Sequence, residues 1–301
     1  MSVMRAALGV ANPLNRRVLR RALSSSSSSP SSNAALGSAT SFRKKLKARS
    51  KGVTIQFAVI PSPVATQAIA AAGCDAICID MEHGPIDYKD VQAMVASVAG
   101  TDTCPLVRVP SIEPLAVKRS LDLGAEGIVF PLAQTAKDVE RAVATLLYPP
   151  HGERGFGPFV AHSRHGFEFT KAAAYYEANP PVCCVLVETA EAVDNIYDIL
   201  NVGGVDVFQL AQFDLSTALG IPGQFTHPTF LDAERRVEDA VFGSSGNAAN
   251  AANAADAAKL GAVALTKERA DVLHGRGYRV IVGFDVLGLK ATTAASQSWV
   301  L

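Results

Sequence analysis

Eight short, almost wholly apolar runs recur along residues 53–301, and they constrain the fold more than any other feature of the chain. Such runs do not alternate between apolar and polar residues, which is typical of parallel strands buried on both faces. The predicted strands are 54–60, 76–80, 105–110, 127–132, 182–188, 205–210, 261–266 and 279–285.

Helix-period segments separate most of these strands: 87–99, 113–123, 135–147 and 190–200. In 135–147 the apolar stripe comprises Val139, Ala142, Val143 and Leu146. Eight strand–helix units in roughly 250 residues predict a closed (β/α)8 TIM barrel in the α/β class. An open doubly wound sheet is the alternative, but the first strand runs into Pro61-Ser62-Pro63 and not into a glycine-rich fingerprint.

Two stretches interrupt the regular pattern. Residues 148–180 are expected to form a long loop, and loops of that length in a compact domain are usually functional. Residues 243–258 have low complexity and are expected to be an insertion without chemistry of its own.

The first 52 residues hold 11 basic residues and no acidic one, the composition of an organellar transit peptide followed by a disordered linker. Arg21-Ala22-Leu23-Ser24 resembles a mitochondrial processing site. We therefore expect a targeting segment over 1–52, a barrel domain over 53–301, and a mitochondrial matrix location. A basic tail without an import role, and a cytoplasmic location, is the alternative.

The charge that remains in the body is strongly acidic. The chain has 28 basic and 28 acidic residues, so residues 53–301 keep 17 basic against 28 acidic ones. An acidic body is unsuited to binding a nucleic-acid backbone. The sequence has no run of about 18 apolar residues, so no membrane span is predicted. Five cysteines without a C-x-x-C spacing indicate small buried hydrophobes in place of a disulfide framework.

Charged residues close several of the predicted strands, at the barrel end where active sites lie. Asp80, Glu82 and His83 end the second strand, and Arg108 lies in the third. Glu188 ends the fifth strand, and Asp214 follows the sixth. A charge buried at such a position needs a partner or a metal.

Glu188 and Asp214 come from neighbouring strands, so their oxygens could converge on one divalent ion, Mg²⁺ or Mn²⁺ before zinc. Alternatively, both acids pair with arginine, or Asp214 begins a helix. His83 has acids close by that can orient its ring, and Arg108 is suited to stabilising an anionic oxygen because it does not lose its proton.

The chain resembles the HpcH/HpaI family of class II pyruvate aldolases, which includes macrophomate synthase-like enzymes. The resemblance runs from about residue 54 to 290. The matching stretches are IDMEHGP (79–85), VRVP (107–110), LDLGAEGIVFPL (121–132), YPPHGERGFG (148–157), VET with VDNI (187–196), GGVDVF (203–208) and FDLSTALGIPGQFTHP (213–228).

The resemblance implies a role for each residue of the rim. Glu188 and Asp214 would bind a divalent metal (Mg²⁺, Mn²⁺ or Co²⁺), and His83 would be the general base. Asp122, with Asp80 as a second candidate, would support His83, and Arg108 would stabilise the enolate. Backbone N–H groups around Phe213 and Asp214 would hold the pyruvate carboxylate. The implied reaction joins or splits a small-molecule 2-oxo acid and an aldehyde, in a homo-oligomer that is commonly a hexamer.

Three positions depart from the family pattern. Leu186 stands where the family usually has a substrate-side glutamine, Ala211-Gln212 replaces Gly-Pro, and Pro158 replaces a small hydroxyl residue. These changes predict an altered substrate preference or weaker pyruvate binding. Two alternatives remain: an oxaloacetate decarboxylase or macrophomate synthase-like enzyme with the same site residues, and a non-catalytic barrel that serves as an assembly module.

Overall fold

Eight parallel strands close into a barrel in the order of the chain, as predicted. The computed structural model describes residues 39–167, 169–243 and 259–297. The barrel closes because β1 pairs with both β2 and β8. The strands are β1 (Val53–Ala58), β2 (Ala76–Asp80), β3 (Cys104–Arg108), β4 (Gly127–Phe130), β5 (Val182–Val187), β6 (Val207–Leu210), β7 (Lys259–Val263) and β8 (Val280–Phe284).

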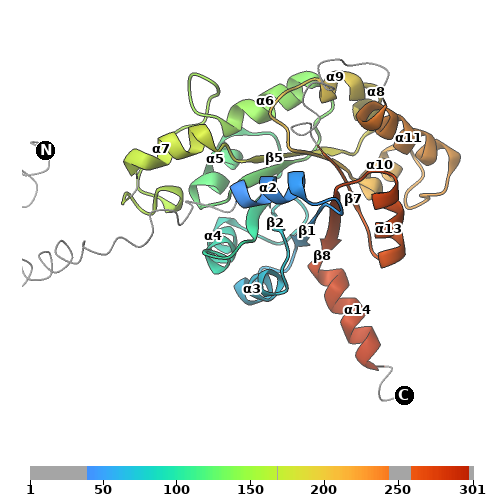
Figure 1. Cartoon of the computed structure of the whole chain (residues 1–301), viewed down its shortest axis with the longest axis horizontal. Coiled ribbons are helices and arrows are strands. Elements are labelled where there is room, and N and C mark those ends of the chain that lie inside the picture. Colours follow the sequence, from blue (N-terminus) through green and yellow to red (C-terminus); the bar gives the residue numbers. More distant parts are fainter. Residues whose placement is uncertain (1–38, 168, 244–258, 298–301) are drawn as a thin grey trace, which may run out of the picture. The chain divides into compact units, whose positions relative to one another are not determined.

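Helices surround the strands and connect them (Figure 1). They are α2 (Ala39–Ala48), α3 (Pro63–Ala71), α4 (Tyr88–Ser97), α5 (Pro114–Asp122), α6 (Ala136–Leu146), α7 (Phe169–Ala178), α8 (Ala190–Asp194), α9 (Ile196–Leu200), α10 (Gln212–Ala218), α11 (Pro228–Phe242), α13 (Lys267–Gly275) and α14 (Asp285–Gln297). The predicted helix at 190–200 is divided into α8 and α9 at Asn195. No helix in these described ranges is long and apolar enough to cross a membrane.

The core has two parts, one inside the barrel and one between the strands and the helices. In β5, Leu186 belongs to the inner cluster, whereas Val185 and Val187 belong to the outer one. This alternation is the two-residue period of a strand, and it fixes which side chains face the interior. All five cysteines are buried and free, as the sequence indicates.

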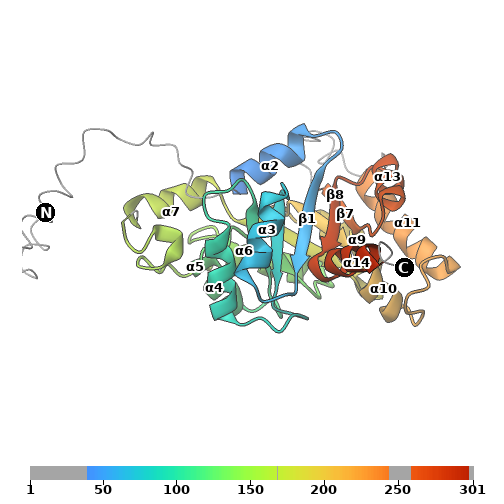
Figure 2. The same cartoon turned by 90° about the horizontal axis from the view of Figure 1, so that it is seen from below.

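Helix α2 corrects the predicted domain boundary. Its Phe42 and Leu46 are buried in the inner cluster, so the barrel includes residues before position 53. Figure 2 shows α2 across the end of the barrel where β1 begins. We call this end the floor. Arg43 and Lys45 of α2, and Arg49 just after it, are held by acids of the barrel, although the sequence suggested that these basic residues were part of a leader. The predicted transit segment up to residue 38 lies outside the described residues.

The stretch 148–180 is not the continuous loop that we expected. It contains α7, in which Ala172 and Tyr176 are buried, because alanine-rich sequence with an apolar face packs as a helix. A short 3₁₀ turn, Ala161–Ser163, and a cis Pro149–Pro150 peptide shape the rest. Of the predicted low-complexity insertion, only Gly243, which follows α11, is described.

Candidate active site

Four strands deliver charged side chains to the end of the barrel opposite the floor, which we call the rim. Asp80 ends β2, Arg108 ends β3, and Glu188 follows β5 directly. Each stands two residues after a member of the inner cluster (Cys78, Leu106 and Leu186), so each faces the barrel interior. Asp214 lies in the first turn of α10, directly after β6. The fold therefore gathers the predicted charges at one mouth.

Arg108 is held in a fixed position by Asp80. Its Nε donates to Asp80 Oδ1 at 2.8 Å and its Nη2 donates to Oδ2 at 2.5 Å, and both side chains are buried. Its Nη1 lies 3.2 Å from Glu82 Oε2, and its guanidinium lies over the ring of Phe57. Such a two-bonded pair orients the cation as well as neutralising it.

We predicted Asp80 as a second candidate to support the imidazole of His83, but the two side chains are not in contact. Asp80 Oδ1 accepts the backbone N–H groups of Glu82 and His83, so it fixes the turn after β2 together with Arg108. The His83 side chain itself is exposed at the mouth. Asp80 therefore anchors the backbone of the predicted base, and its negative charge is directed to Arg108.

Glu188 is buried, with 4% of its surface exposed, and it has little compensation. Its Oε1 accepts one hydrogen bond, from the Leu132 N–H at 2.5 Å. Burial raises the pKa of Glu188 to about 7 against the effect of that N–H, and the nearby charges of Glu82 and Asp214 add to the rise. Leu132 holds its N–H there from a left-handed backbone conformation (φ 55°), a feature that the sequence does not reveal.

Glu82 belongs to the same group, although the sequence did not assign it a role of its own. Burial raises the pKa of its half-buried carboxyl, Arg108 and His83 lower it, and the charges of Asp80 and Asp214 raise it. Three carboxylates (Glu82, Glu188 and Asp214) thus act on one another at the mouth. The position of Glu82 between Asp80 and His83 in the sequence is the feature that could have identified it as a site residue.

Asp122 lies at the other end of the barrel within this chain. It is the last residue of α5, and helices that follow parallel strands run back toward the floor. Its Oδ1 is 3.5 Å from His162 Nδ1. Burial raises the pKa of its carboxyl, although Arg154 and Lys118 counter that rise. Within one chain Asp122 therefore lies away from His83, and its support of His83 stays a prediction.

Comparison with known proteins agrees with this geometry. The model of the HpcH/HpaI aldolase/citrate lyase family matches residues 54–289. The chain belongs to this family. A pyruvate aldolase of Rhizobium etli is 34% identical over 201 residues, which are 66% of this chain and 76% of that protein.

Solved structures support the same assignment. An HpcH/HpaI aldolase/citrate lyase family protein from Burkholderia cenocepacia has a TM-score of 0.75 at 30% identity, over 86% of this chain and 98% of that one. Macrophomate synthase has a TM-score of 0.72 at 24% identity, over 88% and 89%, and this likeness concerns the fold. The chain is therefore a carbon–carbon lyase of the aldolase type, as predicted.

The family's Gly-Pro is replaced here without loss of the loop. Ala211 has φ −89°, so no glycine is required, and α10 begins at Gln212. The Gln212 side chain is paired with the Val263 backbone, since its Nε2 donates to the carbonyl and its Oε1 accepts the N–H, both at 3.2 Å. The N–H groups of Phe213 and Asp214 lie in the first helical turn, where helices leave such donors free.

The rim suits a divalent cation with few protein ligands. Among the residues that the structure describes, no group of three or more His, Cys, Asp or Glu side chains has metal-site geometry. Glu188 and Asp214 provide two carboxylates, and their mutual repulsion contributes to the raised pKa of Glu188. A cation beside them would relieve that repulsion, and oxygen ligands of this kind favour Mg²⁺ or Mn²⁺.

Proposed function

We propose that this enzyme is a divalent-metal-dependent aldolase that cleaves or forms the C3–C4 bond of 4-hydroxy-2-oxo acids, with pyruvate as one partner. One observation carries the proposal: a buried, undercompensated Glu188 stands near Asp214 and beside an arginine that is already fixed in place. The name of the Rhizobium etli relative, pyruvate aldolase, agrees with this substrate class.

Glu188 and Asp214 would hold the cation. When bound, a divalent cation supplies Lewis-acid stabilisation of negative charge on a substrate oxygen. The chain contributes the dry surroundings, because Glu188 is buried and Leu186 beneath it is wholly inaccessible. Electrostatic stabilisation of an anion is stronger in such surroundings than in water.

Arg108 would stabilise the charge that develops on the C2 oxygen of the 2-oxo acid. Its guanidinium is oriented in advance by Asp80, so it does not reorganise as the charge forms. The backbone N–H groups of Phe213 and Asp214 would bind the substrate carboxylate at the start of α10. These contacts position C3 of the substrate at the mouth.

His83 would move the proton. In cleavage it takes the proton from the C4 hydroxyl, the C3–C4 bond breaks, and its electron pair stays with the three-carbon fragment as enolate. The C4 carbon leaves as an aldehyde. In the reverse direction His83 returns the proton to the new hydroxyl. The anchored backbone at His83 and the exposed ring support this role, because a general base must reach a substrate bound at the mouth.

The test is exchange of the pyruvate methyl protons in D₂O, followed by NMR on the metal-stripped chain and again after addition of Mn²⁺ or Mg²⁺. The chain must retain α2, since Phe42 and Leu46 belong to the core. Exchange that requires metal supports enolate formation. Absence of exchange with every metal, from folded protein, contradicts the proposal. Loss of CO₂ from oxaloacetate faster than aldol cleavage would instead favour the decarboxylase.

A further inference from the structure

We propose that Gln209 is a substrate-binding residue, whose side-chain amide replaces the glutamine that the family usually carries at the position of Leu186. The inference rests on the proposed function and names a residue that the family pattern does not predict. It concerns the 2-oxo acid, whose carboxylate and carbonyl oxygens accept a hydrogen bond from the amide when the amide turns to present Nε2 in place of the unpaired Oε1.

Strand register places Gln209 next to Leu186. The two residues are paired across β5 and β6. Leu186 and Val207 belong to the inner cluster, and Phe208 and Leu210 to the outer one. Gln209 therefore faces the barrel interior at the level of Leu186, one step below Glu188. An amide moved from β5 to β6 at this level remains beneath the same mouth.

Gln209 has no partner in the part of the chain that the structure describes. The side chain is 3% exposed, and its Oε1 is buried without a hydrogen bond. An amide buried in this way destabilises the folded chain unless something binds it. Gln212, three residues later and also buried, has both amide atoms satisfied by Val263. The contrast indicates that the Gln209 amide is kept for a ligand.

The experiment measures pyruvate affinity, methyl-proton exchange and thermal stability in three chains: wild type, Gln209→Leu and the exchanged pair Leu186→Gln/Gln209→Leu. One lost hydrogen bond to a charged ligand predicts a dissociation constant for pyruvate that rises about tenfold or more in Gln209→Leu. The exchanged pair should restore affinity to within about threefold, because the amide returns to the neighbouring strand.

A merely structural role for Gln209 would lower the melting temperature and leave affinity unchanged. We expect the opposite, with Gln209→Leu at least as thermostable as wild type. Unchanged pyruvate affinity in Gln209→Leu, or no restoration in the exchanged pair, overturns this inference while wild-type exchange upholds the proposed function. Failure of wild type to exchange pyruvate protons, by contrast, removes the proposed function itself.

A separate observation carries a second proposal. Seven of the buried side-chain nitrogen and oxygen atoms without a hydrogen bond, in the described part of the chain, belong to only four residues. They are Asp122 Oδ1, Tyr148 Oη, both ring nitrogens of His162, and all three guanidinium nitrogens of Arg154. Arg154 is 3% exposed and lies against the rings of Tyr148 and Tyr176. The geometry points to a second binding site here, for an organic carboxylate with an apolar body.

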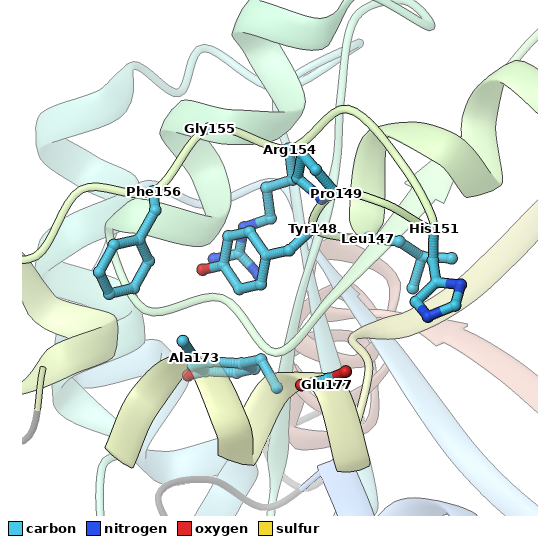
Figure 3. Close-up of a pocket in the computed structure, with 10 residues that line it drawn as sticks. Leu147, Tyr148, Pro149, His151, Arg154, Gly155, Phe156, Ala173 and Glu177 are labelled. Atoms are coloured by element: carbon cyan, nitrogen blue, oxygen red, sulfur yellow. The ribbon is translucent and has the colours of Figure 1, made fainter. Parts of the chain in front are cut away.

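Arg154 lines a cavity of about 680 Å³ between the segment after α6 and helix α7. Its guanidinium nitrogens are buried behind the wall of this cavity, so a carboxylate reaches them when the ring of Tyr148 turns aside. Figure 3 shows Arg154 behind the ring of Tyr148, with Phe156 beside it and Ala173 on the facing helix. Aromatic walls suit an apolar body, and an arginine without hydrogen bonds suits a carboxylate. The other charged or titratable groups nearby are Asp122, His151, His162 and Glu177. Burial, and to a smaller extent the charge of Arg154, lower the pKa of His162 to about 4.

The test uses benzoate, and benzamide as its neutral match, with binding to metal-stripped protein measured by saturation-transfer NMR. Benzoate should bind and benzamide should bind about tenfold more weakly or not at all. Arg154→Gln should weaken benzoate by about tenfold or more. Ala173→Trp, at an exposed helix position, should block the cavity without touching the guanidinium. Equal binding of both probes, or benzoate binding that survives Ala173→Trp, overturns the proposal.

Discussion

The floor and the rim of the barrel both bury acidic side chains, but they treat them differently. At the floor, Asp75 is 3% exposed and accepts Arg49 at 2.8 Å and the Thr54 N–H at 3.0 Å, with Lys45 at 3.3 Å. At the rim, Glu188 is 4% exposed and accepts a single N–H. Burial of an acid therefore does not mark a functional site. A buried acid without a counter-charge does, because its cost must be offset by something that binds.

The largest effect should follow from removal of the rim charge. Glu188→Gln keeps an acceptor for the Leu132 N–H but removes the carboxylate that would hold the cation. We expect metal-dependent turnover to fall about 10³-fold, with no loss of thermal stability. Turnover and bound metal, measured on the same preparation, check this. Activity within tenfold of wild type would show that Glu188 is not a metal ligand.

The matching substitution at the floor should act on stability. Asp75→Asn leaves Arg49 and Lys45 without their shared counter-charge. The free energy of unfolding should fall by about 2 kcal/mol, with turnover per folded molecule unchanged. Denaturant unfolding gives the first quantity and steady-state kinetics the second. A loss of turnover without a loss of stability would contradict the division of roles between floor and rim.

The raised pKa of Glu188 predicts how metal-stripped protein responds to pH. Because its folded pKa is about 7 and its ordinary value 4.5, the folded state binds more protons between these values. The free energy of unfolding should therefore decrease as pH rises through that window, by about 3 kcal/mol relative to Glu188→Gln. Unfolding at several pH values, with and without Mg²⁺, measures it. An identical slope in both proteins would assign the decrease to other groups.

The smallest effect should come from a pair that is exposed. Lys267 and Asp271 form an ion pair on the surface of α13, with side chains 80% and 61% exposed. Lys267→Ala should change the free energy of unfolding by less than about 0.5 kcal/mol, because water screens such pairs. The same denaturant titration checks it. A loss comparable to that of Asp75→Asn would mean that pairing, and not burial, determines the stability of this barrel.

The sequence predicted the barrel and most of the rim, because parallel strands buried on both faces are apolar runs whose ends carry the polar residues. The sequence assigned the residues of α2 to a leader. These basic residues have no acidic residue close by in the sequence, because their partners Asp75 and Asp206 lie further along the chain. The resemblance assigned Asp122 to the rim, whereas α5 carries it to the floor of the same chain, so its role stays a prediction. The sequence could not find Gln209, because the partner of a residue across two strands depends on register, which the strand pattern alone does not give.

Arg43 in α2 donates to both carboxylate oxygens of Asp206, which lies 163 residues further along the chain, at 2.7 and 2.8 Å. It also donates to the carbonyls of Pro180 and Pro181. During synthesis Arg43 therefore emerges long before Asp206, Pro180 and Pro181, and this part of the floor cannot close until the chain up to β6 has been made. Contacts of such long range make folding slow.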